Sequence, residues 1–146
     1  MKKIIKFVFL PLTIIMLSSC EQKVKTDNFS KYFAISTRVS NYWMHRDVDL
    51  IVDINTRDCS ITETVHVSAK FNFYLANGTF LEESTLFEFV IDSGNLGGSY
   101  KITHTISEST DDKIYDYARN HDYDDYSEAF YVKDSVVNVS GKIKTN

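Results

Sequence analysis

The sequence feature that most constrains the fold is a run in which apolar and polar side chains alternate. In Val65–Leu75 every odd position is apolar, and the even positions are mostly polar. Successive side chains of a β-strand point to opposite faces, so this run predicts a strand with one face on a core. Asn77-Gly78 follows, and a second β-rich run covers residues 79–91. Asn-Gly supplies the positive φ angles of a type I′ turn, and the pattern therefore predicts an antiparallel hairpin.

Three further segments show the same two-residue period. They cover residues 48–54, 100–106 and 129–144. In the second of them His104 falls on the core face, where a histidine is more often hydrogen-bonded structure than a metal ligand. In the last segment Phe130 and Val132 are out of phase with Val137 and Val139. We therefore expect a β-bulge near residues 133–135.

Residues 109–128 interrupt the strand pattern. The segment 109–112 (Ser-Thr-Asp-Asp) resembles a capping box, and apolar or aromatic residues recur after it at helical spacing from Ile114 to His121. This predicts a short helix over about Thr110–Asn120, followed by an acidic, tyrosine-rich loop. The whole pattern predicts an all-β fold, an immunoglobulin-like antiparallel β-sandwich with one short helix in an insert around residues 110–120.

The stretch around the expected hairpin also resembles a known family. In residues 70–79 a strand ending in aromatic residues meets Asn77-Gly78, as in the FxLYD-type, immunoglobulin-like domains of bacterial lipoproteins. The sequence departs from that pattern at Leu75 and Ala76, where Tyr or Asp would stand. The resemblance implies a fold and no activity.

The amino terminus has the layout of an export signal. Basic residues come first, an apolar stretch covers residues 7–17, and the small residues Ser18 and Ser19 precede Cys20. The apolar stretch is interrupted by Pro11 and is shorter than the roughly 20 residues that span a bilayer, which disfavours a transmembrane anchor. Residues 17–20 (Leu-Ser-Ser-Cys) resemble the lipobox of bacterial lipoproteins. The resemblance implies cleavage before Cys20, and acyl chains on Cys20 that hold the protein to a membrane.

These features divide the chain into three parts. We expect a cleaved signal peptide (1–19), a lipidated flexible tether (20–28) and a single β-sandwich domain (29–146) in the bacterial cell envelope. Inner or outer membrane, and periplasm or cell surface, stay open. Removing residues 1–19 from the 146-residue chain leaves 13 basic and 20 acidic side chains, a formal charge of −7. Such a domain is a poor nucleic-acid binder, and we expect it to stand off anionic headgroups on its tether.

The second cysteine loses its only intrachain partner if Cys20 carries lipid. Cys59 is then either a buried thiol or a reactive one. The neighbouring Asp58 disfavours a thiolate, so packing is the favoured role.

The candidate site is the acidic segment 111–128, in which carboxylates and tyrosines are interleaved. Its acids suit a basic protein partner, and its tyrosines offer large contact area at low entropic cost. Oxygen-rich loops also suit Ca²⁺, although the EF-hand register is missing. The candidate partner-binding residues are Tyr115, Tyr117, Tyr123, Tyr126, Asp122, Asp124 and Asp125, and the calcium candidates are Asp122, Asp124, Asp125 and Glu128.

Trp43 and its neighbours are a second place where contact with a partner is possible. Trp, Met and Arg are enriched at interfaces, but Trp43 at the end of a strand is more often core. We predict a core position.

Catalytic and cofactor motifs are missing from the sequence. It has no His-Glu-x-x-His, no Gly-x-Ser-x-Gly and no phosphate-loop spacing in the glycine-rich segment 92–98. We therefore expect a non-enzymatic, membrane-anchored protein-binding or accessory module without a cofactor. A small hydrolase or a calcium-binding module using segment 111–128 is the alternative.

Overall fold

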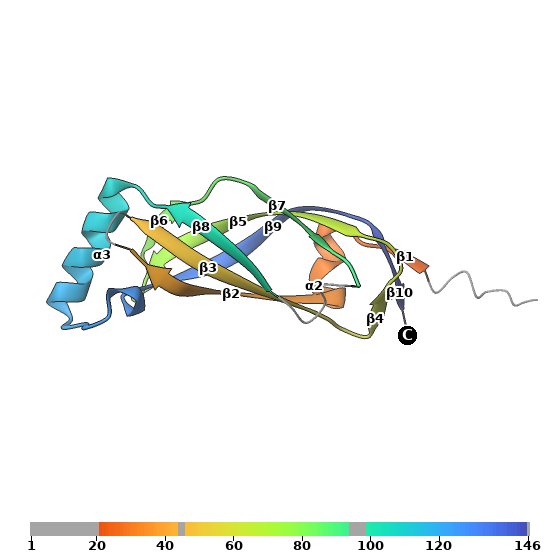
Figure 1. Cartoon of the computed structure of the whole chain (residues 1–146), viewed down its shortest axis with the longest axis horizontal. Helices are drawn as coiled ribbons and strands as arrows, with labels where there is room; N and C mark the ends of the chain where they lie inside the picture. The colour runs from red at the N-terminus through yellow and green to blue at the C-terminus, as the bar shows by residue number, and fades with distance from the viewer. Residues whose placement is uncertain (1–20, 44–45, 94–98, 146) are drawn as a thin grey trace, which may run out of the picture.

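A computed structural model describes residues 21–43, 46–93 and 99–145, and Figure 1 shows its elements. The expected signal peptide and Cys20 lie outside the described residues. The same holds for Met44, His45 and the glycine-containing segment 94–98.

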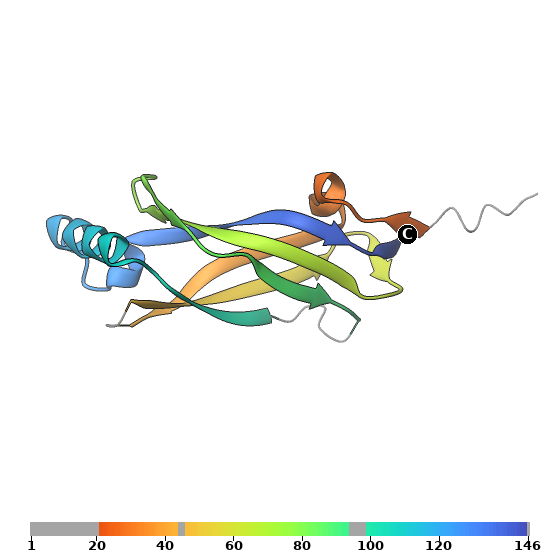
Figure 2. The ribbon, with the colours of Figure 1, turned by 90° about the horizontal axis from the view of Figure 1, so that it is seen from above.

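The described strands form two antiparallel sheets that face each other, as Figure 2 shows, and one small sheet at an end. The first sheet has the order β2-β3-β8, made of Phe33–Tyr42, Asp47–Thr56 and Ser99–Thr105. The second has β5 (Val65–Leu75) at its centre. Its neighbours are β9 (Phe130–Ser140) on one side and β6 (Phe80–Glu83) and β7 (Phe87–Ile91) on the other. The small sheet has the order β1-β10-β4, made of Glu21–Lys23, Lys142–Thr145 and Cys59–Ile61.

Four helical segments accompany the strands in the described part of the chain. They are the 3₁₀ turns η2 (Thr26–Asn28) and η3 (Tyr126–Glu128), the single turn α2 (Phe29–Tyr32) and the longer helix α3 (Glu108–Asn120). None of the described helices is both long and apolar enough to cross a bilayer.

The core lies between the two facing sheets and follows the alternation in the sequence. On β5 the odd-numbered residues are buried, and Phe73 is fully enclosed. On β3 the even-numbered residues from Val48 to Ile54 are at most 1% exposed. The prediction of an all-β antiparallel sandwich with one short helix is confirmed.

The hairpin between β5 and β6 is confirmed, but its turn is not type I′. Gly78 alone has a positive φ, +94°, while Asn77 does not. The Gly78 N–H donates to the Leu75 carbonyl at 2.8 Å, and the Leu75 N–H donates to the Thr79 carbonyl at 2.8 Å. The loop therefore contains three residues, with glycine in the left-handed position, which is the next most common way to close a hairpin.

The bulge in β9 lies further along the strand than predicted. Ser68 pairs with Asn138 and Ala69 pairs with Val136, so Val137 is the extra residue. Val137 is 47% exposed, whereas Val139 is buried. Val137 and Val139 are in one phase of the sequence pattern but do not share a face, and Asp134 lies on the inner face with Val136.

Helix α3 begins two residues earlier than the sequence indicated. Its N-cap is Ser107, whose Oγ accepts from the Thr110 N–H at 3.1 Å, and Ser109 lies inside the first turn. The predicted helical spacing is correct in its inner half, because Ile114 and Ala118 are fully buried.

The molecule is elongated, with α3 at one end and the small sheet at the other (Figures 1 and 2). Residues 21–28 were expected to be a flexible tether. Instead Glu21–Lys23 pairs with β10, and Val24 is 2% exposed in the core. Residues 21–24 therefore belong to the folded domain.

Candidate contact surface at the helical end

Half-buried tyrosines attach α3 to the end of the sandwich. The ring of Tyr42, the last residue of β2, packs edge-on against Phe130 with centroids 5.3 Å apart. It also lies 6.1 Å from Tyr115, which in turn meets Tyr126 at 4.7 Å. The Tyr42 hydroxyl donates to the Asp111 carboxylate. Burial first, and then this carboxylate, raise the pKa of Tyr42 well above its ordinary value, so the hydroxyl keeps its proton.

The remaining tyrosines of the segment stack beside the carboxyl end of α3. Tyr117 stacks on His121 with centroids 4.0 Å apart and on Tyr123 at 6.2 Å. Tyr117, Tyr123 and Tyr126 all pack against the buried core. The four tyrosines proposed as contact residues thus also form the base on which the helix and its loop rest.

Apart from Asp111, which bonds to Tyr42, the acidic side chains of the segment are exposed to solvent. Asp116, Asp122, Asp124, Asp125 and Glu128 are all exposed. The Asp116 carboxylate pairs with Arg119 at 2.7 Å, on the surface of the helix. Asp125 caps η3: its Oδ1 accepts from the Ser127 hydroxyl and the Ser127 N–H, and these bonds lower the pKa of its carboxyl group.

The calcium candidates Asp122, Asp124, Asp125 and Glu128 are near each other in the sequence, but their side chains do not converge. Within residues 21–43, 46–93 and 99–145, no group of three or more His, Cys, Asp or Glu side chains is placed to hold a metal ion. The structure thus gives this expectation no support.

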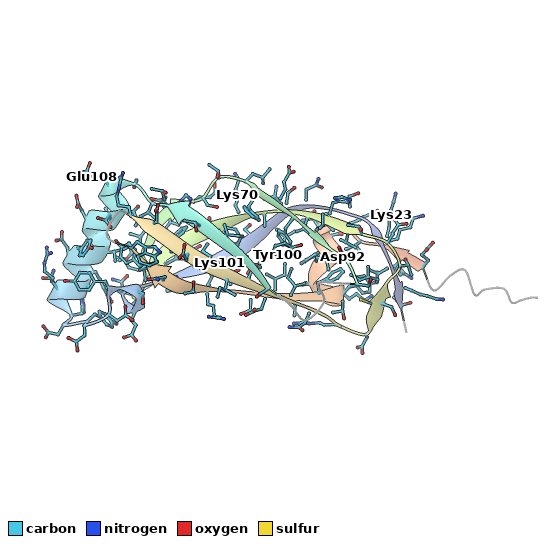
Figure 3. All side chains as sticks on the ribbon, in the orientation of Figure 1. Lys23, Lys70, Asp92, Tyr100, Lys101 and Glu108 are labelled. Atoms are coloured by element: carbon cyan, nitrogen blue, oxygen red, sulfur yellow. The ribbon has the colours of Figure 1, made fainter. Side chains whose placement is uncertain are left out.

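The charge of this end is strongly one-sided. Residues 108–128, which we call the helical end, carry eight carboxylates and two basic side chains. Figure 3 shows Glu108 at this end of the molecule and Lys23 at the other. The clustered carboxylates produce a negative field that favours a basic partner.

Trp43 adds an apolar group beside the helical end, and its predicted core position was wrong. It follows Tyr42 directly and is 52% exposed. Its indole N–H donates to Asp49 Oδ2 at 2.9 Å. Asp49 Oδ1 accepts from the Thr103 hydroxyl at 2.7 Å, and the bonds from Thr103 and Trp43 together lower the pKa of the Asp49 carboxyl. Trp43 is therefore held with one polar contact while its ring stays available.

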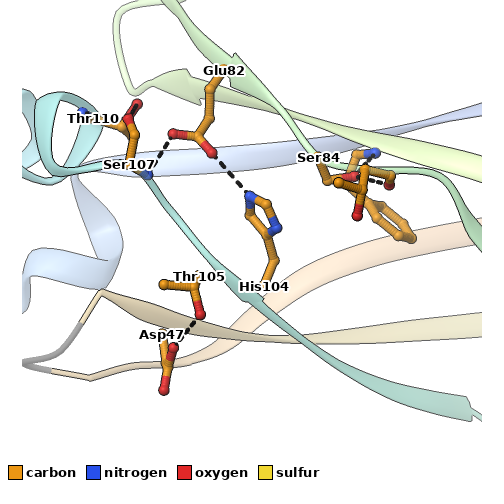
Figure 4. Close-up of polar contacts among 9 residues, drawn as sticks. Asp47, Glu82, Ser84, His104, Thr105, Ser107 and Thr110 are labelled. Carbon is orange, nitrogen blue, oxygen red and sulfur yellow. Dashed lines mark hydrogen bonds and ion pairs between the residues drawn. The ribbon is translucent and has the colours of Figure 1, made fainter.

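Glu82 and His104 form a sheltered polar network at the start of α3 (Figure 4). His104 Nε2 lies 2.9 Å from Glu82 Oε2, and the Ser107 N–H donates to Glu82 Oε1 at 2.9 Å. Burial would raise the pKa of Glu82, but the hydrogen bonds from Ser107, Thr110 and His104 outweigh it and lower the pKa. The Ser107 hydroxyl bonds to Thr110, so these contacts join β6, β8 and the first turn of α3.

The sequence alone does not indicate that Glu82 has a structural role. Glu82 and Glu83 are adjacent, and only the register of β6 against β5 places Glu82 opposite the inward-facing Phe73. The prediction for His104 is in line with the structure, since its ring packs against Phe73 and bonds to Glu82 on the core side.

A pocket of about 260 Å³ lies away from the helical end, between α2 and the edges of β2 and β9. Its walls include Phe29, Phe33 and Val136, and Asp134 and Arg57 are its charged residues. Burial raises the pKa of Asp134, although a hydrogen bond from Thr37 opposes the shift. The sequence did not indicate this pocket, because α2 was not expected.

Cys59 is partly buried and packs against the core. Its Sγ donates to the Tyr32 carbonyl at 3.5 Å, and burial raises the pKa of the thiol. Both observations favour the packing role.

Comparison with known proteins does not place the chain in a family. No family model matches it, and neither a curated protein nor a solved structure is significantly similar to it. The resemblances to the lipobox and to FxLYD-type domains therefore stay predictions, and the functional argument rests on the site itself.

Proposed function

We propose that the chain is a membrane-anchored envelope lipoprotein whose helical end binds a basic protein partner without catalysing a reaction. The observation that carries the proposal is the exposed carboxylate cluster of the helical end, which a tyrosine base holds in place far from residue 21. If acyl chains on Cys20 anchor the protein, this surface lies at the end of the molecule away from its anchor (Figure 1).

The composition of the surface suits recognition by complementary charge. Exposed carboxylates steer a basic partner and disfavour acidic competitors, while partly exposed aromatic rings supply contact area. Tyr115 and Tyr126 lie in the middle of the exposed acids and retain part of their surface. The Trp43 ring, which follows Tyr42 at the end of β2, is a further exposed apolar side chain near this end.

The test is capture of a partner from solubilised envelope by the whole chain and by a charge variant. The variant is Asp122→Asn, Asp124→Asn and Asp125→Asn together. Asn is preferred to Ala because Asp122 has φ +57°, a backbone region that Asn tolerates well. Asn at position 125 also keeps an oxygen for the Ser127 N–H. We expect the variant to lose most of its capture, and the wild-type capture to weaken as salt is raised.

The matched control removes three exposed carboxylates elsewhere. Asp27→Asn, Glu63→Gln and Glu88→Gln change the net charge equally, but these residues lie outside the helical end. This control should capture the partner as the wild type does. Equal capture by both folded variants would refute the helical end as the contact surface.

The anchor is tested by Cys20→Ser. This change removes the thiol that would carry the lipid, so we expect the protein to leave the membrane fraction. Unchanged fractionation together with an unchanged mass of the N-terminal peptide would refute the anchor.

A further inference from the structure

The outer face of the small sheet carries one pair of like charges and one pair of opposite charges across β1 and β10. The antiparallel register sets Lys23 against Lys142 and Glu21 against Lys144. The residues between them, Gln22 and Ile143, face the other way, and Ile143 is fully buried. Like charges directly across a strand pair destabilise it, so the Lys23–Lys142 pair requires an explanation beyond folding.

Further basic residues surround this face. Lys25, Lys31 and Arg57 are exposed, as are Lys23, Lys142 and Lys144. Among the described residues none of these six side chains takes part in an ion pair. Together the segments 21–32, 57–63 and 141–145, which we call the basic end, contain six basic and four acidic side chains. The rest of the domain contains seven basic and sixteen acidic ones.

The basic end also contains a groove large enough for a phosphate-bearing headgroup. The groove measures about 410 Å³, and its walls include Lys31, Arg57 and Tyr32. Asp58 is the acidic residue on its wall. Two cations on one groove wall fit an anion better than a neutral or cationic ligand.

We propose that the basic end docks on an anionic phospholipid surface, with its lysines on the headgroups and the helical end pointing away. This inference rests on the lipid anchor of the proposed function, because residue 20 is attached to the first strand of this end. Charge favours this orientation at both ends of the molecule. Each lysine of the basic end raises partitioning to an anionic leaflet about five-fold, whereas the leaflet repels the carboxylates of the helical end. The net charge of −7 does not show that the two ends of the domain differ in charge. Repulsion from anionic headgroups, which the sequence predicted for the whole domain, therefore applies to the helical end alone.

The experiment uses the full acylated protein, purified from the envelope of a lipidating host and reconstituted into vesicles. One set of vesicles is pure phosphatidylcholine and the other also contains phosphatidylglycerol. Lysines are acylated with a water-soluble amine reagent and quantified by peptide mass spectrometry. We expect several-fold slower acylation of the basic-end lysines (Lys23, Lys25, Lys31, Lys142 and Lys144) on the anionic vesicles. Lys101, Lys113 and Lys133 should be unchanged, and high salt should remove the protection.

A pair of charge-matched variants makes the test specific. Lys23→Gln, Lys142→Gln and Lys144→Gln together should also remove the protection of Lys25 and Lys31. The control, Lys101→Gln, Lys113→Gln and Lys133→Gln, changes the net charge equally and should leave that protection intact. Both variants are compared with the wild type by circular dichroism, so loss of the fold is recognised separately.

The possible outcomes separate the docking from the anchor. Flotation with both vesicle types, together with protection on the anionic one alone, supports the docking. Flotation with both types and equal acylation on both would refute the docking and leave the anchor standing. A protein that floats with neither type would refute the anchor, and with it the docking that rests on it.

Discussion

Replacing Glu82 with Gln should destabilise the protein at neutral pH, because this carboxylate joins β6 to β8 and to the start of α3. Its two oxygens contact His104 Nε2 and the Ser107 N–H, each at 2.9 Å. The side chains of His104 and Glu82 are 17% and 18% exposed, so water competes weakly for these bonds. Gln keeps the shape and one acceptor oxygen, and therefore isolates the charge and the second bond.

The expected loss follows from those two bonds. A hydrogen bond to a charged group contributes about 1.5–3 kcal/mol, and a neutral one about 0.5–1.5 kcal/mol. The two bonds to the carboxylate contribute about 3–6 kcal/mol together, and Gln at position 82 retains one bond in neutral form, so the free energy of unfolding should fall by about 1.5–5.5 kcal/mol. Glu83→Gln is the matched control. Glu83 forms an exposed pair with Lys70 at 3.3 Å, which is worth about 0–1 kcal/mol.

The effect of Glu82→Gln on stability should depend on pH in a definite direction. Because the folded-state pKa of Glu82 lies below the ordinary value of 4.5, ionisation stabilises the folded state. That contribution is fully present above pH 4.5 and is lost as the pH falls through the lower, folded-state value. The difference between wild type and Glu82→Gln should therefore narrow as the pH falls below 4.5.

Urea unfolding followed by circular dichroism at a series of pH values measures both quantities. The reasoning fails if Glu82→Gln and Glu83→Gln unfold at the same urea concentration at neutral pH. It also fails if the gap between Glu82→Gln and wild type does not narrow below pH 4.5. Either result would mean that the Glu82 carboxylate does not clamp the start of α3.

Three other tests, with four substitutions in all, concern the packing of the sandwich. Ile114→Ala should cost about 2–5 kcal/mol in urea unfolding, because Ile114 is fully buried on the inner face of α3. A loss below about 1 kcal/mol would mean that the helix is not docked. Asp134→Asn should raise the melting temperature at pH 7, since burial raises the pKa of Asp134 and disfavours its charge, and the gain should vanish in acid. Val139→Thr should cost about 1–3 kcal/mol, while Val137→Thr, in the bulge, should stay within about 0.5 kcal/mol; equal effects would place the bulge elsewhere.

The sequence predicts those parts of the fold that depend on local period alone. The alternation of β5 identifies its buried face, because any partner strand must meet the same apolar side. The helical spacing from Ile114 to Ala118 likewise identifies the inner face of α3. These patterns need no knowledge of which strand pairs with which.

Features set by pairing between distant strands could not be predicted. The bulge at Val137 depends on how β9 aligns with β5, and the phase change in the sequence indicated only that a bulge exists. Glu82 and Glu83 are chemically equal until β6 takes its register. Trp43 was expected in the core because of its size, but the chain leaves β2 at Tyr42, whose ring fills the space against Phe130.

The helical end and the basic end likewise differ in how far the sequence alone predicts them. The acids of the helical end are contiguous in the sequence, so composition alone revealed them, although not the tyrosine base beneath them. The basic end is assembled from the first and last strands and a turn between β3 and β4. More than a hundred residues separate Lys23 from Lys142, and these two lysines meet only because β1 pairs with β10. The composition indicates an acidic domain, but the fold separates the charges along the long axis of the molecule. The basic end faces the proposed membrane, and the acidic helical end faces the proposed partner.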